Sequence, residues 1–290
     1  MSHVNLNHSD NPVYRRRLLK HKFGIALSTI AMAFGVFFLI WILLTLFMKG
    51  FGSLSWDALT LPTPAPGEEG GGLANALIGS LMMVGFATLI STPIGILAGI
   101  YLAEYGERNW FSDLTRFVTD IMLSAPSVVI GLFVYAIYVA HIKHFSGWAG
   151  SLAISLIAIP VVVRTTDNML ALVPISLREA AFALGAPRWK VALFIRIKAV
   201  KAGILTGVLL AVARISGETA PLLFTALNNQ FTNTDMNKPM ANLPVVIYQF
   251  AMSPYDNWRG LAWTGALLVT FSVLALNILS RTVFAQKNQH

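Results

Sequence analysis

The chain has 290 residues, of which 56% are hydrophobic and 12% are charged, and its formal net charge is +8. A soluble domain carries roughly 25% charged residues, so this composition excludes an ordinary soluble protein and indicates an integral membrane protein. The chain contains no cysteine, which excludes a disulfide framework.

Long, nearly uncharged stretches follow one another along the chain. Each is close to or above the ~20 residues that an α-helix needs to cross a bilayer. The sequence predicts an all-α, polytopic transmembrane helical bundle whose six spans lie at residues 23–47, 73–103, 117–140, 145–163, 202–227 and 260–280. We expect residues 1–22 to form a polar cytoplasmic arm and residues 23–285 to form one transmembrane domain.

The distribution of lysine and arginine predicts the orientation of these spans. With the N-terminus inside, the inside segments hold sixteen of these residues, the outside segments hold four, and Arg214 lies within the fifth span. Such a bias marks cytoplasmic loops, so we expect both termini and residues 164–201 in the cytoplasm. The basic run from Arg15 to Lys22 then serves orientation and lipid contact, and nucleic-acid binding is the minor alternative.

Residues 176–190 carry the start and stop signals of a short helix inside that cytoplasmic segment. Ser176 and Glu179 have the spacing of a capping box. Gly185 suits the left-handed position that follows a helix, and Pro187 blocks continuation. A helix of this length cannot span a bilayer, so we expect it to lie in the cytoplasm.

One face of this short helix is apolar and partly made of small residues. Leu177, Ala180, Ala181 and Leu184 are spaced as one helical face, and we expect it to dock closely against a partner outside the membrane. The alternative is a plain cytoplasmic connector in which Glu179 only caps the helix.

The fifth span contains two opposite charges. Arg214 and Glu218 are four residues apart and can pair on one helix. Together with Gly203, Gly207 and Ala211 they fall within an arc of about 80°. Small residues let a neighbouring helix approach closely, so we expect both charges to face the interior of the bundle.

A charge within the membrane costs roughly 3 kcal/mol on insertion scales and usually marks a pathway or a partner. The guanidinium fork of Arg214 matches a phosphate or carboxylate oxyanion. Glu218 would orient Arg214 and keep anion binding reversible, with Thr219 and Thr225 as further donors. The alternative is an ion pair that only fixes packing.

Two further charges lie near the inside ends of spans. Arg164 either anchors the fourth span by the positive-inside rule or acts at the cytoplasmic exit of a pathway. Asp120, in the third span, is a candidate partner for an arginine.

Other chemistry is not supported by the sequence. The chain has no phosphate-binding loop of the pattern G-x-x-x-x-G-K-[ST], so ATP-driven transport would need the nucleotide on another subunit. His141 and His144 lack nearby cysteine or carboxylate ligands, so no metal site is expected. No catalytic set of nucleophile and base is recognisable, and we expect no enzymatic activity in this chain.

Several segments resemble one family. Glu179-Ala180-Ala181 followed by Gly185 resembles the EAA loop of permeases in binding-protein-dependent ABC importers, where this loop forms coupling helices that sit in a groove of the ATPase. The segments 70–80, 123–133, 145–150, 164–170 and 214–231 resemble the permease subunits of high-affinity phosphate ABC importers. The resemblance extends from about residue 23 to 285.

The resemblance implies a type I ABC importer permease fold and a permease subunit that translocates inorganic phosphate across the bacterial inner membrane. Another oxyanion, such as phosphonate or sulfate, and a phosphate-sensing scaffold are the alternatives. The implied partners are a PstC-like permease, a PstB-like ATPase dimer that holds ATP and Mg, a PstS-like periplasmic phosphate-binding protein and a PhoU-like regulator.

The intramembrane charges make Arg214, Glu218, Thr219 and Arg164 the candidates for the substrate path. The resemblance assigns the coupling segment. The coupling segment would contain Arg178, Glu179, Ala180, Ala181, Leu184, Gly185, Ala186 and Pro187. One departure from the family pattern follows this segment: the usual I-x-L-P is replaced by Ile195-Arg196-Ile197 and Lys198. Without that proline, we expect the next helix to run unbroken into the fifth span.

Overall fold

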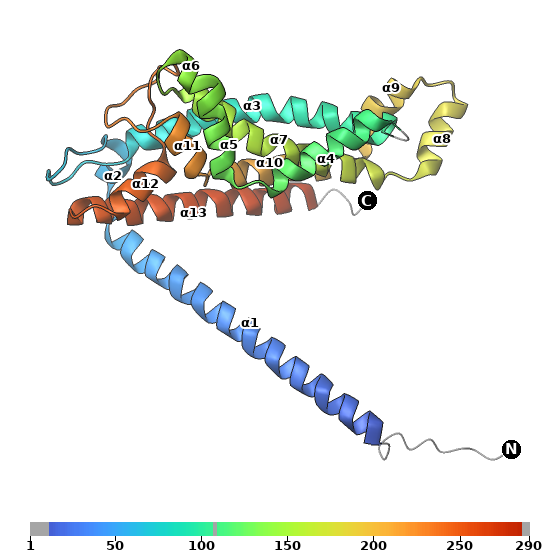
Figure 1. The fold of residues 1–290 in the computed structure, drawn as a ribbon, viewed down its shortest axis with the longest axis horizontal. Helices are drawn as coiled ribbons and strands as arrows, with labels where there is room; N and C mark the ends of the chain where they lie inside the picture. Colours follow the sequence, from blue (N-terminus) through green and yellow to red (C-terminus); the bar gives the residue numbers. More distant parts are fainter. Residues whose placement is uncertain (1–11, 107–108, 286–290) are drawn as a thin grey trace. The chain divides into compact units, whose positions relative to one another are not determined.

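The computed structural model describes residues 12–106 and 109–285, and every regular element in these two ranges is helical (Figure 1). The predicted all-α class is therefore confirmed. The chain divides into two compact units, residues 1–49 and 50–290.

The first unit contains all but the last three residues of α1 (Pro12–Gly52), and those three belong to the second unit. Its side chains between residues 23 and 42 are exposed and apolar around most of its circumference, which is typical of a membrane-spanning helix. The predicted first span, 23–47, lies within α1, and the basic run falls in its first turns. Residues 1–11 of the predicted cytoplasmic arm lie outside the described residues.

The second unit is built on the packing of α3 (Ala74–Tyr105) against α7 (Gly147–Ala171). Gly95 of α3 faces Val162 of α7, and a Cβ atom at Gly95 would lie only 2.6 Å from the Val162 Cβ atom. The two helices can approach this closely because glycine has no side chain. The main hydrophobic core lies around this contact.

The helix α10 (Ile197–Ile215) runs antiparallel to α7. Gly203 of α10 faces Met169 of α7, and Gly207 faces Thr165. The small-residue face predicted for this segment therefore packs against another helix of the same chain. Beside it, α13 (Asp256–Ala285) contacts both α10 and α12 (Leu243–Ala251).

Polar loops join the helices at the end of the unit that holds α2 (Trp56–Thr60). The Asn75 side chain is buried there, accepts hydrogen bonds from the Thr63 backbone and hydroxyl, and donates to the Asn229 carbonyl at 2.8 Å. These bonds hold two loops distant in sequence against each other.

The third predicted span is bent, which corrects the expectation of one continuous helix over 117–140. Helix α4 (Trp110–Ser124) ends before Ala125-Pro126, and the pair of segments meets at an angle of 108°. Proline lacks a backbone donor and disfavours a helical residue before it, so the helix breaks at this dipeptide.

The fifth predicted span is also interrupted. Helix α10 ends at Ile215, and the chain turns through residues 216–219 before the next helix begins. Gly217 N donates to the Arg214 carbonyl at 3.2 Å, and Glu218 N donates to the Ile215 carbonyl at 3.3 Å. The prediction of one helix over 202–227 was wrong, because these tight turns and Pro221 end it.

The remaining helices are short. They are α5 (Ser127–Val134), η2 (Tyr135–Val139), α6 (Ala140–Ile142), α8 (Ile175–Ala183), α9 (Arg188–Lys190), η3 (Val191–Arg196) and α11 (Ala220–Thr225), with η2 and η3 in the π conformation. The segments α9, η3 and α10 follow one another without a gap, so the chain runs unbroken from the cytoplasmic segment into the fifth span, as predicted.

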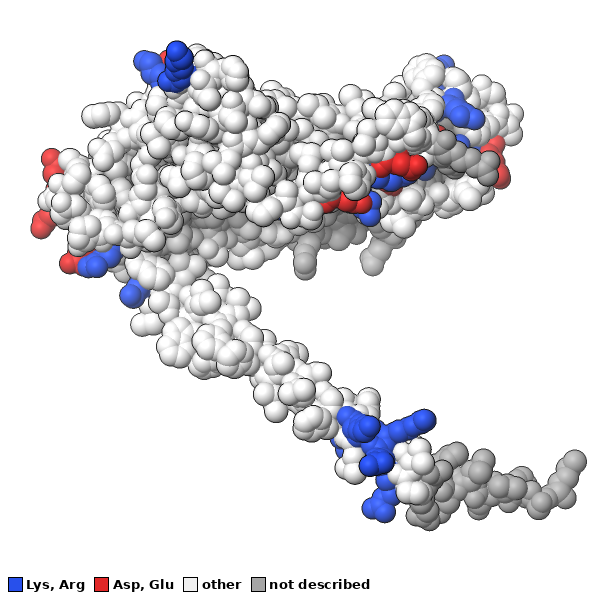
Figure 2. Space-filling model, viewed as in Figure 1, with Lys and Arg blue, Asp and Glu red and all other residues white. Residues whose placement is uncertain are grey.

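The predicted count of six spans is not confirmed. Four described helices are long and apolar enough to cross a membrane, namely α1, α3, α7 and residues 256–280 of α13, and the bent pair adds a fifth if it forms one span. The 19-residue helix α10, which is not among them, carries Lys198, Lys201 and Arg214. In the second unit, charged side chains gather over α4, near α8 and α9 and around the loops at the opposite end, with a largely uncharged surface between α4 and those loops (Figure 2).

Candidate functional site

Arg214 lies in the last turn of α10, and Glu218 lies in the turn that follows. The Arg214 Nε atom is 3.9 Å from the Glu218 Oε1 atom, so the predicted pair forms although only Arg214 is helical. The Arg214 side chain is 45% exposed and that of Glu218 is 16% exposed. The isolated chain therefore presents Arg214 on its surface, which differs from the expectation that both charges face its own interior.

The hydroxyl groups near this pair differ in availability. Thr219 is the N-cap residue of α11 and is partly exposed. Thr225 is fully buried, and its hydroxyl donates to the Pro221 carbonyl at 2.7 Å. Of the two predicted donors, Thr219 is the accessible one.

Arg164 lies inside α7, since this helix continues past the predicted end of the fourth span to Ala171. Its Nη1 atom is 3.7 Å from the Oδ1 atom of Asp120 in α4, and both side chains are about half exposed. The structure thus identifies the partner of Asp120, which the sequence left open.

Arg164 and Arg214 can be placed along the same axis. The residue after Arg164, Thr165, faces Gly207 of the antiparallel α10. Arg214 lies seven residues beyond Gly207, which corresponds to about 10 Å along a helix at 1.5 Å per residue. Two half-exposed arginines, each beside a carboxylate, therefore lie roughly 10 Å apart along the direction of the helices.

The cytoplasmic helix α8 spans Ile175–Ala183, and its ends only partly match the prediction. Pro174 occupies the N-cap position and no side chain caps the helix, so the predicted capping box of Ser176 and Glu179 was wrong. The helix starts two residues earlier than that motif requires, which places Ser176 within its first turn.

The end of α8 follows the sequence closely. Gly185 has a φ of +77°, its N–H donates to the Phe182 carbonyl at 2.9 Å, and Ala186 N donates to the Ala181 carbonyl at 3.2 Å. These two bonds form a Schellman motif, which needs a left-handed residue and favours glycine.

The predicted docking face of α8 is largely open. The side chain of Leu184 is 89% exposed and that of Leu177 is 41% exposed, and Ala180 is also exposed. Ala181 is buried against the same chain. Arg178 lies over the Phe182 ring at 5.6 Å and Pro187 caps α9.

Sequence reasoning missed a buried ion pair between Glu104 and Arg196. Glu104 lies near the end of α3 and Arg196 ends η3; both side chains are almost fully buried, and the Arg196 Nη1 atom contacts the Glu104 Oε1 atom. The signal in the sequence was an acidic residue directly after a long uncharged stretch. A second, more exposed pair links Arg116 of α4 to Asp167 of α7 at 3.5 Å.

The apolar cavity among α3, α10, α12 and α13 does not suit an anion. It has a volume of about 370 Å³ and is lined by leucine, valine and serine side chains. One of these, the Ser80 hydroxyl, already accepts a hydrogen bond from Leu243 N at 2.7 Å.

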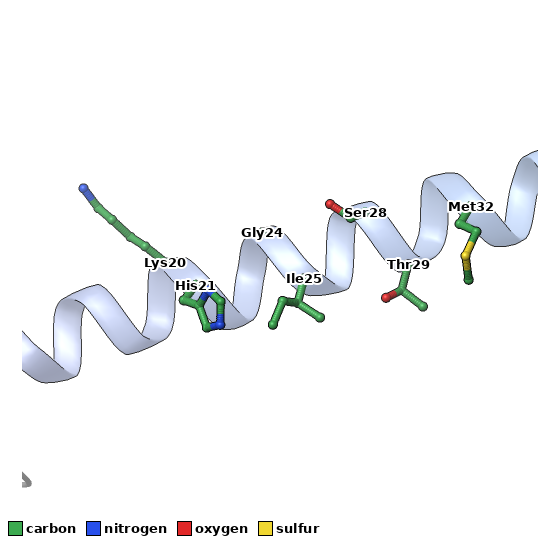
Figure 3. Close-up of a pocket in the computed structure, with 7 residues that line it drawn as sticks. All are labelled: Lys20, His21, Gly24, Ile25, Ser28, Thr29 and Met32. Atoms are coloured by element: carbon green, nitrogen blue, oxygen red, sulfur yellow. The ribbon is translucent and has the colours of Figure 1, made fainter. Parts of the chain in front are cut away.

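The first unit carries a shallow groove along one helix. Figure 3 shows its lining residues, which run from Lys20 to Met32 and all belong to α1. Each of them is exposed, so the groove is a gap between side chains on a helix surface and encloses nothing. No cluster of three potential metal ligands occurs within the described ranges.

Comparison with known proteins gives consistent results. A model of the family described as binding-protein-dependent transport system inner membrane component matches residues 95–286. The chain is 60% identical over 279 residues to the phosphate transport system permease protein PstA of Pasteurella multocida. The aligned region covers 96% of this chain and 99% of that protein. It is 61% identical to the protein of the same name from Haemophilus influenzae, over 93% of this chain and 96% of that protein.

Solved structures support the fold. A chain of a bacterial alginate ABC transporter, in complex with its alginate-bound periplasmic protein, matches with a TM-score of 0.59 and 15% identity, covering 93% of this chain and 97% of that one. A chain of the inward-facing MetNI methionine ABC transporter matches with a TM-score of 0.57 and 17% identity, covering 74% and 93%. These likenesses extend to the helical architecture.

Proposed function

Because this chain belongs to the family of binding-protein-dependent transport system inner membrane components, we propose that it is the transmembrane permease subunit of an ATP-driven importer that translocates inorganic phosphate across the bacterial inner membrane. The observation that carries the proposal is the 60% identity to a phosphate permease over nearly the full length of both chains. It is a multi-pass membrane protein, and its role is transport without catalysis of its own.

Arg214 is the residue best suited to phosphate. Its guanidinium is held by one carboxylate oxygen at 3.9 Å and is 45% exposed, so most of its donors remain free for an anion. A planar guanidinium binds two phosphate oxygens at once. Glu218 competes for the same donors, which keeps the anion from binding too tightly to leave.

Arg164 provides a second anion-binding position about 10 Å further along the helices. It has the same arrangement, a half-exposed guanidinium beside a carboxylate, here Asp120 at 3.7 Å. We propose that the anion passes from Arg214, with Thr219 as an additional donor, to Arg164 and then to the cytoplasm.

The energy for transport would enter through α8. Its exposed face, centred on Leu184, is proposed to sit in a groove of a PstB-like ATPase dimer, which holds the ATP and Mg. A PstC-like permease would complete the membrane part, a PstS-like protein would deliver phosphate from outside, and a PhoU-like regulator would act from inside. Both termini of the chain are proposed to be cytoplasmic.

The test is transport by the purified complex in liposomes. We expect ATP-dependent uptake of radiolabelled phosphate that stops when this chain is omitted. Unlabelled phosphate should compete, whereas sulfate and methylphosphonate should not. ATP-dependent uptake of sulfate or phosphonate without uptake of phosphate would contradict the proposed substrate.

A further inference from the structure

The buried guanidinium of Arg196 binds two elements at once. Its Nη1 atom contacts Glu104 near the end of α3, and its Nη2 atom donates to the Leu170 carbonyl of α7 at 2.6 Å. Arg196 itself ends the π-helix η3. Three helical elements therefore meet at a single side chain.

The contact between Arg196 and Leu170 joins the two ends of the segment that carries α8. Leu170 lies just before the segment that carries α8, and Arg196 lies just after it. The bond between them closes the base of a hairpin formed by residues 171–195. Glu104 connects this closed base to α3, whose glycines pack directly on α7.

The contact of Arg196 with Glu104 and Leu170 lies in an apolar, buried part of the protein. The side chains of Ile100, Leu170 and Ala192 form a small buried cluster around it, and polar contacts are stronger in such a low-dielectric setting. The second oxygen of Glu104 has no hydrogen-bond partner among the described residues. The buried carboxylate thus depends on Arg196 for its charge compensation.

The local backbone fits the same role. The backbone that leads from the hairpin to α10 is π-helical over Val191–Arg196. π-Helical turns are rare in proteins, and those that occur often lie at functional positions. Here the π-helical turn forms the returning end of the hairpin and leads directly into α10.

We propose that Arg196 is the positioning residue that couples the α8 hairpin rigidly to α3 and α7, so that motion imposed on α8 reaches the helices along the anion path. This inference rests on the proposed contact between α8 and the ATPase. It concerns transmission of movement, and neither Arg196 nor Glu104 needs to touch the anion or the nucleotide.

The decisive variant removes both charges together. Glu104→Met/Arg196→Met replaces the pair with apolar side chains, which proteins often tolerate, whereas a single substitution leaves a buried charge. The full complex in liposomes should still hydrolyse ATP, but uptake per ATP hydrolysed should fall at least about fivefold, within the usual range of coupling effects. An unchanged ratio would overturn the proposal.

A matched control uses the other ion pair near this end of the helices. Arg116→Gln/Asp167→Asn removes a pair that joins α4 to α7 without closing the hairpin, and it should leave uptake per ATP unchanged. An equal loss in this control would overturn the specific assignment to Arg196. If the double methionine variant does not assemble, Arg196→Lys decides, because it keeps the charge and loses the planar fork: reduced coupling supports the proposal, and full coupling overturns it.

A spin-label distance separates this inference from the proposed function. The chain has no cysteine, so labels at Ser176→Cys in α8 and Leu97→Cys in α3 are unique within it; both positions are exposed. We expect one narrow distance that ATP binding leaves unchanged, and a broad, ATP-sensitive distance in the double methionine variant. Narrow distances in both would overturn the rigid link. Failure of the ATPase to bind the unmodified chain would instead overturn the proposed function.

Discussion

At the scale of single residues, three arginines of the second unit occupy two kinds of environment. Arg214 and Arg164 are about half exposed and contact one carboxylate each at 3.9 and 3.7 Å. Arg196 is buried and uses both of its terminal nitrogens inside the protein. The first kind keeps donors available for a ligand, whereas the second kind has the properties of a structural link.

This difference leads to a prediction for Arg214. Substitution Arg214→Gln should lower phosphate uptake by roughly 10- to 100-fold with the complex still assembled, since a hydrogen bond to a charged group contributes about 1.5–3 kcal/mol. Arg214→Lys should recover part of the uptake, because lysine keeps the charge without the bidentate geometry. Initial uptake rates in liposomes measure both effects.

The control distinguishes transport from packing. If the Arg214–Glu218 pair only stabilises the fold, Arg214→Gln/Glu218→Gln leaves no unpaired charge and restores uptake. Restored uptake would therefore contradict a role in the substrate path. Arg259→Gln, which breaks an exposed pair with Asp256, should have no effect.

At the scale of elements, α8 is a short helix whose exposed surface is unusually apolar. Its tip residue Leu184 is 89% exposed, whereas Ala181 on the neighbouring turn is buried. The Schellman motif at Gly185 holds the end of the helix in one conformation. A rigid apolar tip of this kind is suited to insertion into a groove of another protein.

For this element we predict that Leu184→Asp weakens binding of the partner ATPase by about tenfold or more, as expected for an apolar anchor at the centre of an interface. Leu172→Asp changes a leucine that is 70% exposed but lies before α8, and it should leave binding unchanged. Binding of the ATPase to the immobilised permease provides the measurement. Equal affinities for both variants would show that the tip of α8 is not the contact.

At the scale of the whole molecule, the prediction concerns orientation. Because the inside segments hold sixteen lysine and arginine residues and the outside segments hold four, the C-terminus should be cytoplasmic. A green fluorescent protein fused after His290 should fluoresce, and alkaline phosphatase fused at the same point should be inactive. Active alkaline phosphatase at this position would rule out the proposed arrangement.

What the sequence by itself determined depends on local signals. The membrane class follows from uncharged stretches of about 20 residues, and the end of α8 follows from Gly185, whose φ of +77° is costly for other residues. The spacing of four residues made Arg214 and Glu218 candidates for a pair, and the turn after α10 brings them together. Each of these features depends on the chemistry of a few neighbouring residues.

Only the tertiary structure decided which distant residues meet. Glu104 and Arg196 are 92 residues apart in sequence, and their contact arises because α3, α7 and η3 converge at one end of the unit. The partner of Asp120 and the burial of Ala181 were likewise open, since hydropathy and periodicity describe one helix at a time. Packing between helices selects these contacts, and no local sequence pattern specifies which helices pack together.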